Sequence, residues 1–462
     1  IRLFRVVVPA SLLVLMAVEA GLAFGSYLLG FLLTREEDWA IFYLYEGGTA
    51  QTLAAVGSLM LGVYLNDLYS QVRVYSRLRL AQQYCLVFGV AFLAQGMISY
   101  VLPELALARS QMMAGSLVGL IALPSWRMLF DVLVLRVLHR QRILFVGHNR
   151  LAQTVARTIA ERPHFAMESA GYLSPQPLEG APAGLGPWLG PVSGLRKVHA
   201  EQKPDRIVVG LDDRRGQLPV EDLLALRLTG VPVEDVTTLY EHVMWRVPVE
   251  VLRPSQLIFG VGLGPDPRKL ALQRVYSFAF ALAGALLTLP LMGLIWALVR
   301  ITSPGPAIYR QKRVGRNGRV FEVLKFRSMY QDAEARTGAV WAAHNDPRVT
   351  PLGRWLRKLR LDELPQFFNV LKGEMCIVGP RPERPEFVDV LSQKIPYYNL
   401  RHSIPPGITG WAQINHKYGE TIEDVVTKLE YDLYYLKNMS FSLDLYILFH
   451  TAKVMLFQRG AQ

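Results

Sequence analysis

The chain has 462 residues, of which 51% are hydrophobic, and its mean hydropathy is +0.21. This composition excludes a disordered or fibrous protein and predicts several domains, one of them in a membrane. Lys and Arg number 50 against 38 Asp and Glu, and the net charge of +12 suits a protein that handles phosphates or contacts anionic lipid. The two cysteines, Cys85 and Cys376, lie far apart and form neither a metal motif nor a disulfide framework.

Four apolar stretches are long enough to cross the hydrocarbon core of a bilayer, which takes about 20 residues of helix. They lie at Ile1–Leu33, Gly47–Leu68, Leu80–Leu102 and Gln111–Leu135. Basic residues lie at the start of the first stretch, separate the second from the third and follow the fourth. The positive-inside rule therefore places both ends of this bundle in the cytoplasm. We predict a domain of four transmembrane helices over residues 1–138.

Residues 139–264 are predicted to form a degenerate Rossmann-like α/β domain. Arg142–Gly147 and Asp205–Gly210 are apolar strands, and a helical pattern follows the first of them. A working dinucleotide site has a GxGxxG sequence at the first turn, whereas this chain has only Gly147, followed by His-Asn-Arg-Leu-Ala. We therefore expect this domain to serve in packing, regulation or contact between two copies of the chain, as in a homodimer.

A fifth stretch, residues 276–299, contains 24 residues without a charge and is interrupted by Pro290. Basic residues flank both of its ends, so the charge rule places both ends on the cytoplasmic side. A re-entrant helix that enters the membrane, breaks at Pro290 and returns satisfies this arrangement. A complete span with a proline kink is the alternative, and hydropathy alone does not separate the two.

The most basic region of the chain runs from Arg300 to Lys372, with 15 Lys and Arg against 6 Asp and Glu. This density of positive charge predicts an anion site at the membrane surface. Two alternating strand patterns, Ala307–Val314 and Arg319–Phe326, flank an Asn-Gly pair, which favours the positive φ angles of a tight hairpin turn. The predicted hairpin carries the polar residues Gln311, Arg313, Lys325 and Arg327.

An amphipathic pattern at Leu352–Leu359 has basic residues between its apolar positions, which is typical of a helix in the lipid interface. It leads into Asp362 and Glu363, and Pro365 suits the first turn of another helix. Two adjacent carboxylates among many cations form either an ion-pair network or a catalytic pair, in which one is a nucleophile and the other a Mg²⁺ ligand. Local chemistry alone leaves these two interpretations equal.

Two later loops carry groups suited to a substrate. Gly379–Pro385 is a rigid, proline-rich turn that presents Arg381 and Arg384, and guanidinium groups bind phosphate or a planar base. Pro405–Asn415 combines turn residues with polar side chains and an aromatic residue, which fits a substrate loop and a structural loop equally well.

Three segments of the C-terminal half form a shared pattern: QKRVGRNGRVFEVLKFRSM at 311–329, RLDELPQFFNVLKGEMCIVGPRP at 360–382 and PPGITGWAQIN at 405–415. Together they resemble the bacterial sugar transferases known as monotopic phosphoglycosyl transferases. The preceding spans and Rossmann-like domain resemble the N-terminal half of the large polyisoprenyl-phosphate hexose-1-phosphate transferases. The implied fold is an α-helical membrane bundle, a degenerate Rossmann-like domain and a mixed α/β monotopic catalytic domain, residues 265–462, with a re-entrant membrane helix.

The resemblance implies transfer of a hexose-1-phosphate from a UDP-sugar to polyprenyl (undecaprenyl) phosphate, with release of UMP and with Mg²⁺ as cofactor. This step begins exopolysaccharide, capsule or O-antigen synthesis at the bacterial inner membrane, with the catalytic domain facing the cytoplasm. By resemblance Asp362 is the nucleophile that forms an aspartyl-phosphosugar intermediate, and Glu363, together with Asp362, binds the metal. Arg357 matches a phosphate-binding arginine, Pro380-Arg381-Pro382 the uridine site and Pro290 the helix-breaking proline.

Lys325, Arg327 and Lys417 complete the predicted substrate-binding residues. Many relatives have arginine where Lys417 stands, and a lysine offers a point charge without bidentate geometry. A non-catalytic membrane scaffold or regulator of polysaccharide assembly is the alternative function. A nucleotide-sugar epimerase or dehydratase in the Rossmann-like domain would need the missing glycines. No motif supports nucleic-acid binding, and the motifs do not specify which hexose is transferred.

Overall fold

The computed structural model describes residues 2–3, 6–7, 10–35, 38–66, 68–69, 77–137, 140–162, 165–178, 180, 184–212, 217–252, 264–331, 333, 346–416 and 421–456. The contacts between residues divide the chain into two compact units. The first contains Val7–Val236, and the second contains Thr237–Gln462 together with Arg2–Val6. The domain boundaries predicted at residues 138 and 264 stay predictions.

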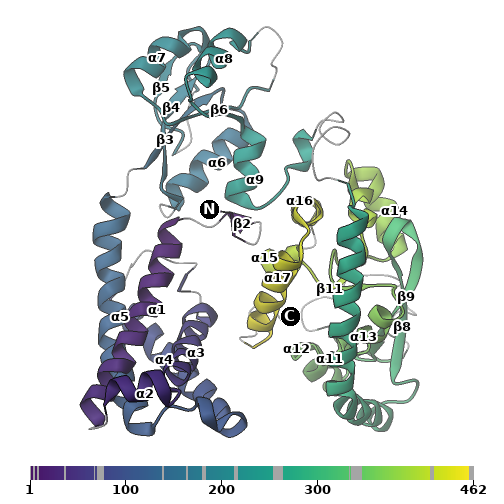
Figure 1. Ribbon diagram of the computed structural model, residues 1–462. Helices are drawn as coiled ribbons and strands as arrows, with labels where there is room; N and C mark the ends of the chain where they lie inside the picture. The colour runs from purple at the N-terminus through teal and green to yellow at the C-terminus, as the bar shows by residue number, and fades with distance from the viewer. Residues whose placement is uncertain are drawn as a thin grey trace. The chain divides into compact units, whose positions relative to one another are not determined.

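Long apolar helices make up the N-terminal part of the first unit (Figure 1). Five of the described helices are long and apolar enough to cross a membrane, and four of these belong to the first unit. Those four agree with the apolar stretches predicted from the sequence. The helices of this part are α1 (Ala10–Thr34), α2 (Trp39–Tyr45), α3 (Gly48–Leu65), α4 (Arg77–Val101) and α5 (Arg109–Val137). Two short strands, β1 (Arg2–Leu3) and β2 (Val6–Val7), precede them in the chain.

One acidic side chain, Glu19 on α1, is fully buried among these helices. Its carboxylate lies 3.2 Å from Arg127 Nε of α5 and accepts a hydrogen bond of 2.9 Å from the Tyr84 hydroxyl of α4. A buried charge is tolerated where it is paired and hydrogen-bonded. Glu19 therefore faces the interior of the bundle.

A five-stranded parallel sheet forms the rest of the first unit. Its strand order is β5 (Trp188–Gly190), β4 (Met167–Leu173), β3 (Gln141–Val146), β6 (Arg206–Val209) and β7 (Val233–Asp235). Helices α7 (Leu195–Gln202) and α8 (Val220–Leu228) cover one face, and α6 (Arg150–Glu161) lies on the other (Figure 1). The first strand of the domain in the sequence, β3, is central. The later strands are added outward on both sides of it, as in a Rossmann-like domain.

Rossmann-like folds bind dinucleotides in the crevice between the carboxyl ends of strands such as β3 and β6. In this chain, backbone groups that follow the two strands approach each other closely there. Gly147 has a φ of +93°, and a Cβ atom there would lie 2.4 Å from the carbonyl oxygen of Gly210. Asn149 donates its backbone N–H to the same carbonyl, and its side chain accepts a bond from Ala152 N at the N-terminus of α6. The helix terminus that would hold a pyrophosphate is thus capped by Asn149.

The helix α11 (Pro267–Thr302) contains the fifth candidate span and has Pro290 in its interior. Proline removes one helical hydrogen bond and bends a helix without necessarily ending it. In Figure 1 the last turns of α11 depart from the direction of its longer first part. The two parts also pack into different hydrophobic cores, since Leu270 and Ala281 belong to one and Met292 to another.

An antiparallel hairpin of β8 (Ile308–Val314) and β9 (Val320–Phe326) follows α11. Asn317 and Gly318 have φ angles of 55° and 75°, which confirms the predicted Asn-Gly turn. The main core of this unit joins α11 to the C-terminal helices. The other elements of the unit include α12 (Pro351–Lys358), η6 (Leu361–Glu363), α13 (Gln366–Leu371), β10 (Cys376–Val378), α14 (Pro385–Lys394), η7 (Tyr398–Ser403), β11 (Gly407–Thr409), α15 (Trp411–Asn415), α16 (Ile422–Asn438) and α17 (Phe441–Leu456), while α9 (Val236–Met244) precedes α11.

Candidate active site

The two adjacent carboxylates, Asp362 and Glu363, lie on the short 3-10 turn η6 between α12 and α13. The apolar residues on either side of them, Leu361 and Leu364, pack onto the core formed by the second part of α11. This packing fixes the backbone of the turn, because both leucine side chains contact the hydrophobic core. A rigid turn of this kind can present a carboxylate to a ligand in one orientation.

Cations surround Glu363. Its Oε1 atom lies 3.0 Å from Lys325 Nζ of β9 and 3.0 Å from Arg381 Nη2, while its Oε2 atom lies 4.0 Å from Arg360 Nη1. The side chain is only 12% exposed. Burial by itself would raise the pKa of Glu363, but the charges of these three cations hold it below its ordinary value. Glu363 is therefore ionised at neutral pH.

The neighbouring Asp362 has a different environment. It is buried, and among the described residues no side chain donates a hydrogen bond to its carboxylate. Burial and the adjacent charge of Glu363 raise the pKa of Asp362, while Lys325, Arg357 and Arg381 oppose this shift. Two adjacent carboxylates with opposite pKa shifts suit different chemical tasks. Asp362 is the less stabilised anion and thus the better candidate nucleophile.

Arg357, on the last turn of α12, lies near these carboxylates. Its Nε donates a hydrogen bond of 2.9 Å to the Ser328 hydroxyl, and its charge is among those that lower the pKa of Asp362. Asp346 and Arg348, an ion pair of 2.5 Å, act electrostatically on the same guanidinium. The structure thus brings Arg357 within electrostatic reach of Asp362, while its role in phosphate binding stays a prediction.

The Pro380-Arg381-Pro382 segment is fixed through all three of its carbonyl groups. Gly407 N donates to Pro380 O at 3.0 Å, Arg401 Nη2 to Arg381 O at 3.1 Å and Arg313 Nη1 to Pro382 O at 3.0 Å. The preceding parallel pair of β10 and β11 sets the start of the segment. These hydrogen bonds hold the backbone of Arg381 in place, and its guanidinium contacts Glu363 from this fixed position.

Sequence reasoning missed Arg401, which is 7% exposed and lies behind this segment. In addition to Arg381 O, Arg401 bonds the Tyr398 hydroxyl at 2.8 Å and pairs with Asp432 of α16 at 2.7 Å. Burial raises the pKa of Asp432 to about 6, and Arg401 acts in the opposite direction. An acidic residue within the aromatic run Tyr431–Tyr435 was the available signal, because a buried acid requires a buried cation.

One predicted substrate-binding residue, Arg327, lies away from the carboxylates. Arg327 turns to the end of α11, where its Nη2 donates to Ser303 O at 2.7 Å and to Ser303 Oγ at 2.8 Å. A cation at a helix C-terminus satisfies free carbonyl groups and favours the helix dipole. Lys417 lies outside the described residues. Lys325, Arg357 and Arg381 are the predicted cations that the structure does bring together.

The carboxylate pair has the donor chemistry for Mg²⁺. Among the described residues no group of three His, Cys, Asp or Glu side chains could hold a metal. Mg²⁺ commonly takes one or two protein carboxylates and fills its other positions with water and substrate phosphates. Asp362 and Glu363 fit that pattern, although Lys325 and Arg381 already contact one oxygen of Glu363.

The helix α11 is suited to a membrane, and the basic hairpin and the carboxylate turn follow it in the same unit, so this unit has the features of a membrane-associated domain. The family model of the bacterial sugar transferases matches residues 268–458, which include all of these elements.

Curated relatives extend this match. The chain is 42% identical over 261 residues to the UDP-N-acetylgalactosamine-undecaprenyl-phosphate N-acetylgalactosaminephosphotransferase of Aeromonas hydrophila, covering 56% of this chain and 60% of that protein. It is 37% identical over 268 residues to the undecaprenyl-phosphate glucose phosphotransferase of Komagataeibacter xylinus, covering 56% of this chain and 50% of that one.

A third relative is matched over more of its length. The UDP-glucose:undecaprenyl-phosphate glucose-1-phosphate transferase of Xanthomonas campestris pv. campestris is 34% identical over 337 residues, covering 70% of this chain and 68% of that protein. The chain belongs to the bacterial sugar transferase family. The match to the first two relatives spans only half to 60% of their own length.

Proposed function

We propose that this protein transfers a sugar-1-phosphate from a UDP-sugar to undecaprenyl phosphate and releases UMP. The observation that carries the proposal is the buried pair Asp362–Glu363, whose two pKa values shift in opposite directions while Lys325, Arg357 and Arg381 converge on it. Relatives named as undecaprenyl-phosphate phosphotransferases support the same reaction. Their printed names differ in the sugar, so the hexose stays open.

The proposed reaction has two steps. A carboxylate oxygen of Asp362 attacks the β-phosphorus of the UDP-sugar, the bond from that phosphorus to the bridging oxygen breaks, and UMP leaves with the bond electrons. A phosphate oxygen of undecaprenyl phosphate then attacks the same phosphorus in the aspartyl phosphosugar. This second attack restores the Asp362 carboxylate and yields a polyprenyl diphosphate sugar.

The chain's own groups have separate roles in this scheme. Lys325 and Arg357 would bind the diphosphate and offset its repulsion of the Asp362 carboxylate, and Arg381 would bind the uridine phosphate while orienting Glu363. Glu363 and Asp362 would hold Mg²⁺, which when bound neutralises charge on the diphosphate. The cation cluster thus stabilises charge that would otherwise prevent a carboxylate from attacking an anion.

We also propose the membrane arrangement. Helices α1, α3, α4 and α5 would cross the bacterial inner membrane, and α11 would enter it and return at Pro290, so that the second unit faces the cytoplasm. The interior proline, the change of direction in α11 and the basic residues on both sides of the helix support this arrangement. The reaction would then be the first membrane step of a surface or secreted polysaccharide.

The test is UMP release by the purified chain from a panel of UDP-sugars, with Mg²⁺ and undecaprenyl phosphate, beside Asp362→Asn. We expect lipid-dependent UMP from one sugar and none from the variant. The matched control is Asp222→Asn, which alters a partly exposed ion pair with Arg196 in the first unit and should retain full activity. A folded protein that releases no UMP from any sugar would favour the scaffold function.

A further inference from the structure

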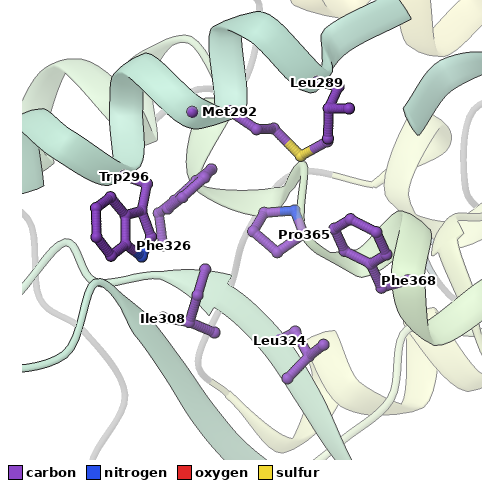
Figure 2. A pocket seen from close by; sticks show the side chains of 9 residues that line it. Leu289, Met292, Trp296, Ile308, Leu324, Phe326, Pro365 and Phe368 are labelled. Carbon is purple, nitrogen blue, oxygen red and sulfur yellow. The ribbon is translucent and has the colours of Figure 1, made fainter. Parts of the chain in front are cut away.

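An apolar cavity of about 280 Å³ lies within the second unit (Figure 2). Its walls come from the part of α11 around Pro290, from the β8–β9 hairpin and from the start of α13. Every wall residue is apolar or glycine, and Figure 2 shows the labelled side chains directed toward a common space. The cavity therefore offers no partner for a polar ligand and suits a hydrocarbon.

This cavity adjoins the carboxylate turn. Pro365, one of its walls, follows Asp362 by three residues and stands just before α13. Leu324 and Phe326 face the cavity, while Lys325 between them points to the opposite face of β9 and contacts Glu363. One strand and one turn thus separate a charged site from an apolar one.

The cavity is also continuous with the apolar outer surface of α11. Leu289 and Trp296, which line it, are 53% and 52% exposed, and Phe368 of α13 is 40% exposed. Neighbouring leucines of α11, Leu287 and Leu294, are exposed as well. A hydrocarbon chain could therefore pass from a lipid phase along α11 into the cavity without crossing a polar surface.

We propose that this cavity binds the isoprene units of undecaprenyl phosphate nearest to its phosphate. The proposal rests on the proposed function, in which the acceptor phosphate must reach Asp362 while its chain stays in apolar surroundings. Because the volume lies near the lower end of the range for ligand pockets, about 300–1,000 Å³, it holds only a short part of the chain. A phospholipid acyl chain has similar chemistry, but only the acceptor needs a place on the turn that carries Asp362.

Gly293 provides a direct way to fill the cavity. A Cβ atom at this position meets no other atom within 4 Å, and leucine is a better helix former than glycine, so Gly293→Leu should fold. We expect the KM for undecaprenyl phosphate to rise at least tenfold. The exchange of labelled UMP into UDP-sugar, which needs only the donor step, should change less than twofold. Ala283→Leu, at an exposed position of α11 outside the cavity, is the matched control.

A binding measurement separates this proposal from the proposed function. An isoprenyl phosphate with a photoreactive diazirine on its second isoprene unit should label the peptides around Gly293 and Leu324. Undecaprenyl phosphate should prevent this labelling, whereas phosphatidylglycerol at the same concentration should not. If labelling and its competition persist while the wild-type chain shows no UMP exchange, the two-step reaction is wrong and the cavity assignment stands.

Two results would overturn the assignment. One is an unchanged KM for undecaprenyl phosphate in Gly293→Leu with UMP exchange intact. The other is equal competition by phosphatidylglycerol, which would identify the cavity as a seat for a bilayer lipid that anchors α11.

Discussion

The parallel sheet of the first unit and the carboxylate turn of the second differ in how far their polar groups are paired within the chain. At the end of β3, Asn149 caps α6 and bonds Gly210, so the chain satisfies the groups that a phosphate would otherwise meet. At η6, three cations converge on Glu363 while Asp362 receives no hydrogen bond from a described side chain. A fold suited to nucleotides is thus no indicator of a site, whereas unbalanced buried charge is one.

The largest expected effect tests this comparison with matched glutamates. Glu363→Gln removes the charge that the three cations face and should lower the rate of UMP formation on the order of 10²-fold or more, because preorganised charge is lost. Glu234→Gln removes the partner of Arg206, 2.8 Å away in the parallel sheet, and should leave the rate unchanged. Steady-state UMP release from both variants measures the difference. Equal losses would mean that both regions contribute to the reaction.

A second test concerns the buried cation behind the Pro-Arg-Pro segment. Arg401→Lys keeps a charge for Asp432 but cannot also hold Arg381 O and the Tyr398 hydroxyl, so Arg381 loses its fixed position. We expect the KM for the UDP-sugar to rise about tenfold, corresponding to about 1.4 kcal/mol, with a smaller change in kcat.

The control for this variant is Arg206→Lys in the parallel sheet, which should change neither constant. Thermal unfolding of both variants provides the structural comparison. A fall in Tm of Arg401→Lys with unchanged kinetic constants would assign Arg401 to stability alone.

The pH dependence of UMP exchange gives a third test. Because burial and Glu363 raise the pKa of Asp362, the nucleophile becomes protonated at a higher pH than an ordinary aspartate, and exchange should fall as the pH drops through this raised value. Lys325 opposes the shift, so Lys325→Met should move the acid limb to still higher pH. Lys437→Met, which removes the partner of Glu241, should leave the limb in place. A limb that moves to lower pH in Lys325→Met would contradict the proposed electrostatics.

The smallest expected effect on activity lies in the first unit. Asn149→Ala removes the cap of α6 and should lower the free energy of unfolding by about 1 kcal/mol, while UMP release stays unchanged. Denaturant unfolding and the UMP assay measure the two quantities. Loss of activity without loss of stability would show that the Rossmann-like domain does take part in the reaction.

Local patterns carried much of the fold prediction. Hydrophobic runs identified the apolar helices, alternation identified the hairpin strands, and the Asn-Gly pair identified their turn. The Leu352–Leu359 pattern became α12, where Leu356 is buried but Trp355 is 64% exposed. Its position in a lipid interface stays a prediction. These features were readable because each depends on residues close together in the chain.

The sequence by itself determined the apolar helices, the Rossmann-like strands, the hairpin and the adjacent acids, since spacing and side-chain type specify them locally. Only the tertiary structure decided which cations reach those acids. Arg381 contacts Glu363 across 18 residues of chain, and Arg401 pairs with Asp432 although β11 and α15 lie between them in the sequence. Arg327, two residues beyond Lys325, lies instead against the end of α11. Long-range packing decides where charged side chains lie. A local sequence pattern therefore does not predict which of several nearby arginines contacts the carboxylates.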